Sequence, residues 1–316
     1  MSSIPKSDTV FNGKRLSRVI LGTHIFGTSL PKEQSFALMD IYSGAGGNVI
    51  DTAAAYGGGE SERCIGEWLK ERGCREDIVL CSKCGNPELD GGTFIRHRIN
   101  EREMREDLER SFESLRTDYI DIYFLHKDDP SVSVREIIDF FQPYLSSGAI
   151  RHIGASNWTL DRINEANAYA SSRGLRGFEV SELAFCLKQH SQGWGYGERM
   201  IEISRADFGG YLENQMPVFG YNPQAYGYFY KNFDRPESEM DSSKENKETV
   251  KRLREICEKR GLNVYQGLFG TYFGCGLRAF PIVSTSKAEH LLDVINNCDV
   301  TLERADARYI FGERYF

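Results

Sequence analysis

Short apolar runs with strand character alternate with longer amphipathic runs along most of this 316-residue chain. Strict alternation of this kind predicts a parallel sheet, because each connection between parallel strands crosses over through a helix. Eight such units predict closure into one α/β barrel of the (β/α)8 type, the TIM barrel. The strand-like runs cover residues 19–21, 48–51, 78–82, 119–125, 150–154, 178–181, 217–220 and 280–284, and the helix-like runs include 60–72, 96–115, 134–147, 160–173 and 244–260.

A barrel of this kind takes about 250 residues as one domain, so residues 1–316 are expected to form a single domain. Near the N-terminus, Asn12 and Gly13 separate two short alternating runs. This pair favours a two-residue turn, so the chain should begin with a β-hairpin. Residues 228–243 mix aromatic and charged side chains before the eighth strand-like run, and are expected to form a long loop.

The charge balance limits the kinds of partner. The formal net charge is −7 and the pI is about 5.5, whereas a nucleic-acid-binding surface is normally basic. No apolar run approaches the roughly 18 residues that a membrane span needs, and the first residues lack the apolar stretch of a signal peptide. We expect a cytoplasmic protein without nucleic-acid or membrane partners, in an oligomeric state that the sequence leaves open.

Residues 96–116 carry i,i+4 charge pairs such as Glu101 with Arg105, and are expected to face solvent.

Eight cysteines are scattered along the chain, and Cys81 and Cys84 have C-x-x-C spacing. A structural zinc site needs four ligands, usually from two such pairs or from one pair with histidines. The chain has no second pair. We therefore interpret these residues as a buried strand cysteine and its neighbour, and expect no metal site.

Four polar side chains lie at or just after the ends of three successive strand-like runs. Asp51 ends the second run and Tyr56 follows five residues later, Lys83 closes the third run and His126 closes the fourth. Catalytic residues of parallel α/β barrels gather at the carboxyl ends of the strands. The order and local sequence of the four residues resemble the aldo-keto reductase family, whose members reduce carbonyls with a nicotinamide cofactor. The resemblance implies that the hairpin caps the barrel floor and that long loops surround the barrel mouth.

These side chains can together protonate a carbonyl oxygen as hydride arrives. A free tyrosine has a pKa of about 10 and is a weak acid at neutral pH. Lys83 would lower the pKa of Tyr56, since a unit charge about 4 Å away is worth roughly 4 kcal/mol at an effective dielectric constant of 20. Asp51 would keep Lys83 charged and in place, and His126 would donate a hydrogen bond to the carbonyl. The resemblance implies the same four catalytic roles.

Other interpretations stay open. Each of the four residues alone could be structural, as a helix cap, a half-buried aromatic, an extended surface lysine or a core histidine, but their joint occurrence favours catalysis. Some members of this fold family are regulatory subunits that sense cofactor with little turnover, and this is the main alternative. A different barrel enzyme, such as a metal-dependent hydrolase, is disfavoured because the chain lacks H-x-H and H-E-x-x-H patterns.

The resemblance also implies where the cofactor binds, across the barrel mouth and without a G-x-G-x-x-G fingerprint, which this chain lacks. Ser156 and Asn157 match the family pair that binds the nicotinamide carboxamide, and they offer the donor and acceptor that an amide needs. Tyr221 matches an aromatic residue that stacks on the nicotinamide ring. Further cofactor contacts are expected from Gly22, Thr23, Glu182, Asn222, Gln224, Ser284, Thr285, Ser286 and His290.

Three places depart from the family pattern. Glu182 stands where members often carry a glutamine that bonds the carboxamide, and a carboxylate donates only when it is protonated. Ser284 and His290 stand near a lysine and an arginine that hold the 2′-phosphate in NADPH-specific members. Val294 replaces an adenine-binding asparagine. Because hydroxyls, a histidine and a helix N-terminus can still hold a phosphate, NADP(H) is favoured and NAD(H) is possible.

The substrate is expected to be a small carbonyl compound held by the loops that follow the strands. Residues 187–196 and 225–230 mix aromatic and polar groups, which suits a sugar-like or polyol-like carbonyl and suits an aromatic aldehyde nearly as well. The physiological substrate and the direction of the reaction are left open. The residues expected to contact substrate are His24, Phe26, Trp158 and Trp194.

Overall fold

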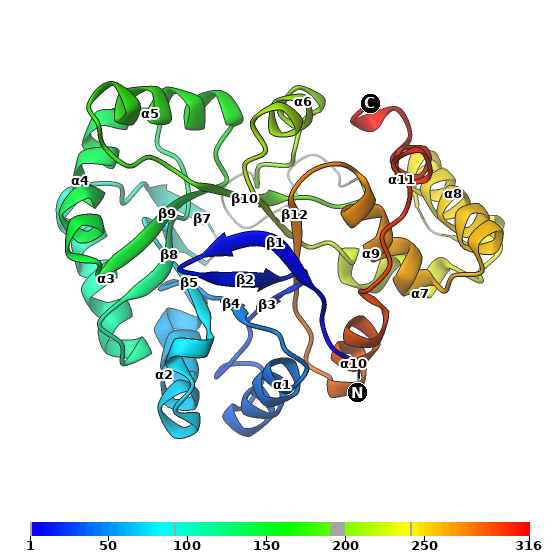
Figure 1. Ribbon diagram of the computed structural model, residues 1–316, viewed down its shortest axis with the longest axis horizontal. Helices are drawn as coiled ribbons and strands as arrows, with labels where there is room; N and C mark the ends of the chain where they lie inside the picture. Colours follow the sequence, from blue (N-terminus) through cyan, green and yellow to red (C-terminus); the bar gives the residue numbers. More distant parts are fainter. Residues whose placement is uncertain (1, 92, 190–199, 241) are drawn as a thin grey trace.

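The computed structural model describes residues 2–91, 93–189, 200–240 and 242–316. Eight parallel strands close into a barrel in the order in which they follow along the chain (Figure 1). Each predicted strand-like run forms one of these strands, so the predicted (β/α)8 barrel is confirmed. The barrel strands are β3 (Ile20–Gly22), β4 (Val49–Asp51), β5 (Val79–Cys84), β8 (Ile120–Leu125), β9 (Ile150–Ser156), β10 (Val180–Ala184), β11 (Val218–Tyr221) and β12 (Ala279–Val283).

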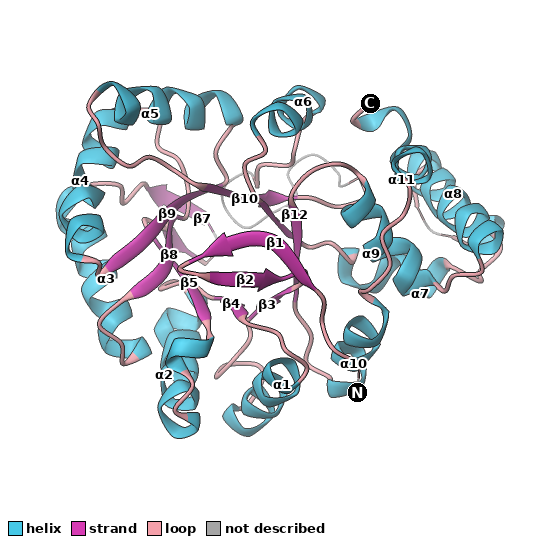
Figure 2. Cartoon of the chain, in the orientation of Figure 1, coloured by secondary structure: helices cyan, strands magenta, loops and turns pink. Residues whose placement is uncertain are grey.

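Helices surround the barrel and pack their apolar faces on its outer surface (Figure 2). Serine, threonine or asparagine side chains cap the N-termini of several of them, because these side chains accept hydrogen bonds from the first free backbone amides. Among the described residues, no helix combines the length and the apolar character that a membrane span requires. The helices are α1 (Lys32–Gly44), α2 (Glu60–Arg72), α3 (Glu101–Leu115), α4 (Val134–Ser147), α5 (Leu160–Ser172), α6 (Arg205–Asn214), α7 (Tyr228–Asn232), α8 (Lys244–Arg260), α9 (Val264–Gly274), α10 (Ala288–Asn297) and α11 (Arg304–Phe311).

The N-terminal hairpin closes one end of the barrel. Strands β1 (Lys6–Phe11) and β2 (Lys14–Ser17) pair antiparallel, and both turn residues between them have positive φ, as a two-residue hairpin turn requires. Phe11 and Leu16 pack against apolar side chains inside the barrel. Figure 1 shows the hairpin lying across the barrel. The predicted hairpin is therefore present, and it leaves the carboxyl ends of the strands open on the other side.

Two predictions about the outer layer are wrong. The segment 228–243 is not a continuous loop, because its first residues form α7 and a 3-10 turn follows at Glu237–Glu239. The charged segment that begins at residue 96 does not simply face solvent either. Glu103 and Asp107 on α3 are buried and form ion pairs with arginines that precede the helix. Hydrogen bonds from Arg96 lower the pKa of Glu103 to about 2.

The C-x-x-C pair lies within β5. Cys81 packs inside the barrel and Cys84 packs in the outer layer, because residues three apart on a strand point to opposite faces. All eight cysteines are free, and burial raises the pKa of both thiols. The pair is thus held as two separate buried thiols.

Candidate active site

Lys83 lies at the centre of a polar cluster in the barrel mouth. This Lys83 cluster also contains Asp51, Tyr56 and Glu182. Its ammonium donates to Asp51 Oδ1 at 2.6 Å and to the backbone oxygen of Thr52 at 2.9 Å, and it lies 3.4 Å from the hydroxyl oxygen of Tyr56. The side chain is fully buried. Burial acts to lower the pKa of Lys83, but Asp51 and Glu182 more than offset this and hold its pKa well above the ordinary value. Lys83 therefore stays protonated.

Glu182 is a second carboxyl group beside the same ammonium. It lies in β10, with Oε1 3.4 Å from Lys83 Nζ, and it accepts a hydrogen bond from Ser156 Oγ at 3.2 Å. Burial, reinforced by the nearby Asp51, raises the pKa of Glu182 to about 8. The sequence placed Glu182 at the cofactor but missed its ion pair with Lys83. A glutamate within an apolar strand-like run was the available signal, because a buried acid normally requires a cationic partner.

Tyr56 begins the 3-10 turn Tyr56–Gly59 between β4 and α2. The three residues after it are glycines with positive φ, and this lets the chain turn sharply into the helix. The tyrosine ring is half-buried and meets the His126 ring edge-on, with 5.9 Å between centroids. Burial raises the pKa of Tyr56 above its ordinary value, and Lys83 offsets only part of this rise. Lys83 thus lowers the pKa of Tyr56 as expected, but burial outweighs this effect.

His126 follows β8 and is held by its backbone, whose N–H donates to the oxygen of Cys84 at 2.8 Å. Burial and the positive charges of Lys83 and Lys127 lower the pKa of His126 well below its ordinary value. The imidazole is therefore neutral near pH 7 and carries one N–H. Its Nδ1 atom is buried without a hydrogen-bond partner in the described parts of the chain. Such a ring can donate a hydrogen bond without adding a charge to the site.

Asn157 joins three strand ends across the mouth. Its Nδ2 donates to the backbone oxygen of His126 and to Ser156 Oγ, both at 3.1 Å. Its Oδ1 accepts from the Tyr221 hydroxyl at 2.7 Å and from the backbone N–H of Ile201 at 3.3 Å. The structure thus brings Ser156, Asn157 and Tyr221 together next to the Lys83 cluster. A bound primary amide would have to replace some of these hydrogen bonds.

Two predicted cofactor residues serve the packing of the barrel. The hydroxyl of Thr23 is fully buried between the backbone oxygen of Asp51 at 2.8 Å and Ser61 Oγ at 2.9 Å. At Gly22 a Cβ atom would lie 2.7 Å from the Ile282 side chain. Both residues are buried, and packing against neighbouring elements of the barrel accounts for them without a cofactor.

The other predicted cofactor residues lie on the β11 and β12 side of the mouth. Ser284 follows β12, and its Oγ lies 3.3 Å from His24 Nδ1. Gln224 donates to the Tyr230 hydroxyl at 2.6 Å. Asn222 is half-buried in the loop after β11 and has positive φ. The remaining three line the approach to α10: Thr285 is half-buried, and Ser286 and His290 are exposed.

Two of the four predicted substrate residues are wrong. Phe26 is 0% exposed and Trp158 is 1% exposed, so neither offers a surface to a substrate. Trp158 instead packs edge-on against Phe178 in the outer layer. His24 is exposed at the mouth, and its ring centroid lies 6.3 Å from that of Tyr56. Trp194 lies outside the described residues.

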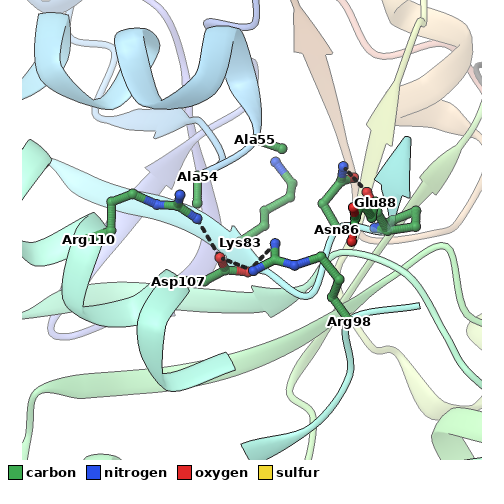
Figure 3. A pocket seen from close by; sticks show the side chains of 9 residues that line it. Ala54, Ala55, Lys83, Asn86, Glu88, Arg98, Asp107 and Arg110 are labelled. Carbon is green, nitrogen blue, oxygen red and sulfur yellow. Dashed lines mark hydrogen bonds and ion pairs between the residues drawn. The ribbon is translucent and has the colours of Figure 1, made fainter. Parts of the chain in front are cut away.

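A cavity of about 200 Å³ opens beside Lys83. One wall is formed by Ala54 and Ala55, and another by the ion-paired side chains of Arg98, Asp107 and Arg110 (Figure 3). The sequence did not predict this wall. The available signal is the dense alternation of charges in residues 96–116, although this spacing by itself predicts a solvent-facing helix. The cavity has room for a small polar group next to the Lys83 cluster.

The polar groups at the mouth fit a nicotinamide cofactor. Glu182 Oε2 is buried without a hydrogen-bond partner in the described chain, beside the hydroxyl of Ser156, so a carboxamide would meet an unsatisfied carboxyl oxygen there. Lys287 and His290 are exposed at the start of α10, where a phosphate would meet positive charge and backbone amides. Within the described residues, no three histidine, cysteine or carboxylate side chains gather as a metal-binding group.

Comparison with known proteins supports the same assignment. The chain is 28% identical over 315 residues to norsolorinic acid reductase B of Dothistroma septosporum, a match that covers 94% of this chain and 78% of the relative. It is also 28% identical over 298 residues to a probable aryl-alcohol dehydrogenase, AAD4, of Saccharomyces cerevisiae, covering 89% of this chain and 88% of the relative. Norsolorinic acid reductase B of Aspergillus parasiticus is 35% identical over 178 residues, and that match spans only 46% of its length.

A solved structure, that of aldo-keto reductase AKR11C1 from Bacillus halodurans in its holo form, superimposes with a TM-score of 0.73. The alignment covers 97% of this chain and 95% of the other at 20% sequence identity, so it supports the fold. The model of the Aldo/keto reductase family matches residues 18–311, nearly the whole chain. This protein therefore belongs to the aldo/keto reductase family and is an oxidoreductase.

Proposed function

We propose that this protein reversibly reduces an aldehyde or ketone to an alcohol with NAD(P)H. The observation that carries the proposal is the buried ammonium of Lys83, which Asp51 holds 3.4 Å from the hydroxyl of Tyr56. A nicotinamide cofactor bound at the mouth would supply the hydride for the carbonyl carbon. The Tyr56 hydroxyl gives its proton to the carbonyl oxygen, and solvent returns a proton to the tyrosine.

The four side chains divide this work by charge. Tyr56 is the general acid, and its raised pKa keeps its proton in place in the resting protein. As the proton leaves, Lys83 stabilises the phenolate that forms, and Asp51 keeps the ammonium oriented. The neutral imidazole of His126 donates a hydrogen bond that orients the carbonyl oxygen. In the reverse direction the same tyrosine accepts the proton from the alcohol.

The cofactor contacts that we propose lie on the side of the mouth formed by β9 to β12. Ser156, Asn157 and Glu182 would bind the carboxamide, and the ring of Tyr221 would lie against the nicotinamide. This proposal is supported by the hydrogen bonds that already join Asn157 to Tyr221 and to Ser156. The outer contacts with the nucleotide would come from Asn222, Gln224, Ser284, Thr285, Ser286 and His290.

Cofactor titration tests the proposal directly. Quenching of tryptophan fluorescence by NADPH and by NADH should saturate, with a smaller Kd for NADPH. Substitution of the exposed Lys287 by alanine should raise the NADPH Kd by about two- to fivefold and leave the NADH Kd unchanged, because an exposed charge pair is worth about 1 kcal/mol or less. No saturable binding of either nucleotide would contradict the reductase assignment. Tight binding without turnover would favour the cofactor-sensing alternative.

We propose an aromatic aldehyde or ketone as the substrate class, with sugar-like and polyol-like carbonyls as the alternative. Exposed or half-buried rings of His24, Tyr56 and Tyr221 border the site, and the name aryl-alcohol dehydrogenase of one relative points the same way. Ring stacking is worth about 0.5–1.5 kcal/mol, so kcat/KM for 4-nitrobenzaldehyde should exceed that for xylose by about two- to tenfold. A higher kcat/KM for xylose in steady-state assays would favour sugar-like and polyol-like carbonyls as the substrate class instead.

A further inference from the structure

The Lys83 cluster contains one more ionisable group than the proposed reduction uses. Glu182 Oε1 lies 3.4 Å from Lys83 Nζ, and Asp51 Oδ1 lies 2.6 Å from the same atom. Both carboxyl groups are 3% exposed, so one buried ammonium lies between two buried acids. The other titratable groups that interact electrostatically with Glu182 are Tyr56 from the turn before α2, Cys81 from β5 and Tyr221 from β11.

The hydrogen bonding of Glu182 favours its protonated form. Ser156 donates to Oε1 at 3.2 Å, whereas Oε2 is buried and has no hydrogen-bond partner in the part of the chain that the structure describes. An ionised carboxylate in this position would keep one charged oxygen buried without a donor, which is costly. A protonated carboxyl carries no charge and can donate to the carboxylate of Asp51, whose hydrogen-bond interaction with Glu182 contributes to its raised pKa. The pKa of Glu182, which burial and Asp51 raise to about 8, agrees with this arrangement.

We propose that Glu182 is a positioning residue that acts through Lys83 and must carry a proton for efficient carbonyl reduction. The inference rests on the proposed function. With Glu182 neutral, Lys83 and Asp51 form a balanced pair, and the ammonium is free to support the Tyr56 oxygen as negative charge builds there. With Glu182 ionised, two carboxylates compete for one ammonium, and an added negative charge opposes the phenolate. Reduction should therefore slow as Glu182 releases its proton to solvent.

The variant Glu182→Gln tests this, because glutamine keeps the shape of the protonated acid and never ionises. The rate constant kcat for reduction of 4-nitrobenzaldehyde by NADPH is measured from neutral to alkaline pH. In the wild type, kcat should fall as pH rises through about 8. In the variant this fall should move up by about one pH unit or more, toward the titration of Tyr56. An unmoved alkaline limb would overturn the role of Glu182 while leaving the proposed function intact.

Glu62→Gln is the matched control. Glu62 is on α2, outside the barrel, and is also buried, with one oxygen accepting from Ser82 of β5 at 2.5 Å. Its other oxygen has no hydrogen-bond partner in the described chain, and burial raises its pKa as well. This variant removes an equivalent acid away from Lys83, so its pH profile of kcat should match the wild type. A shift as large as that of Glu182→Gln would overturn the inference.

Equilibrium unfolding gives a readout that does not need turnover. The pKa of Glu182 is raised above its value in the unfolded chain, so its contribution to stability is complete below about pH 4 and is lost progressively as pH rises from there to about 8. The wild type should therefore lose stability relative to Glu182→Gln over that range. A difference that does not change with pH would overturn the protonation of Glu182. Absence of reduction by the wild type at every pH would overturn the proposed function itself.

Discussion

A Tyr56→Phe variant is expected to lose about 10³-fold of kcat for carbonyl reduction and to bind NADPH with nearly the same Kd. The substitution removes the hydroxyl 3.4 Å from Lys83 and keeps the ring that packs against His126. A positioned general acid contributes about 10²- to 10⁴-fold to a rate, so loss of the proton donor should act on the chemical step. Single-turnover reduction of 4-nitrobenzaldehyde measures that step, and fluorescence titration measures cofactor binding.

The control for this prediction is Tyr309→Phe. Tyr309 is half-exposed on α11, and its hydroxyl donates to Glu255 at 2.5 Å on the outside of the protein. The same chemical change at that position should leave both turnover and NADPH binding unaltered. If Tyr56→Phe instead reduced binding and turnover equally, Tyr56 would be a structural residue. Unchanged turnover would show that Tyr56 takes no part in the reaction.

The sequence predicts the fold well because the periodicity of apolar residues is a local property. Eight strand-like runs become eight barrel strands, and the helix-like runs 60–72, 134–147 and 244–260 coincide with α2, α4 and α8. The run beginning at residue 96 was wrong because its charges make tertiary ion pairs. Arg96 lies in the short strand Thr93–Arg96, and it reaches the buried Glu103 on α3. Nothing in the spacing of charges distinguishes such a partner from solvent.

The site was predictable to the extent that it depends on strand ends. Asp51 and Lys83 lie at the ends of the neighbouring strands β4 and β5, Tyr56 follows β4, and the barrel brings the three within hydrogen-bonding distance. The direction of a side chain is not encoded in its position along a loop, which is why Phe26 and Trp158 were placed in the site but lie in the core. The contact between Glu182 and Lys83 joins strands that are not neighbours. The order of the strands along the chain therefore does not predict it, and it becomes apparent only in the closed barrel.

A Lys83→Met variant is expected to lose both turnover and stability. Methionine fills a similar volume without the charge, so Asp51 and Glu182 remain as two buried acids with no cation between them. Removing one partner of a buried ion pair destabilises a protein by about 3–5 kcal/mol. Acids left in this state bind protons more tightly than in the unfolded chain, so the deficit in unfolding free energy should grow as pH rises above about 4. Urea unfolding of the wild type and the variant at several pH values measures this deficit.

The double variant Lys83→Met with Asp51→Asn separates the two losses. It removes the cation and one carboxylate together, and the remaining Glu182 can stay protonated, so most of the lost unfolding free energy of about 3–5 kcal/mol should return. Turnover should not return, because no ammonium remains to stabilise the phenolate of Tyr56.

Recovered turnover would mean that Lys83 acts on the reaction only by stabilising the fold. Failure to recover stability would mean that the ion pair is not the source of the loss. The predicted outcome, a stable but inactive protein, would show that the charge of Lys83 serves the chemistry directly.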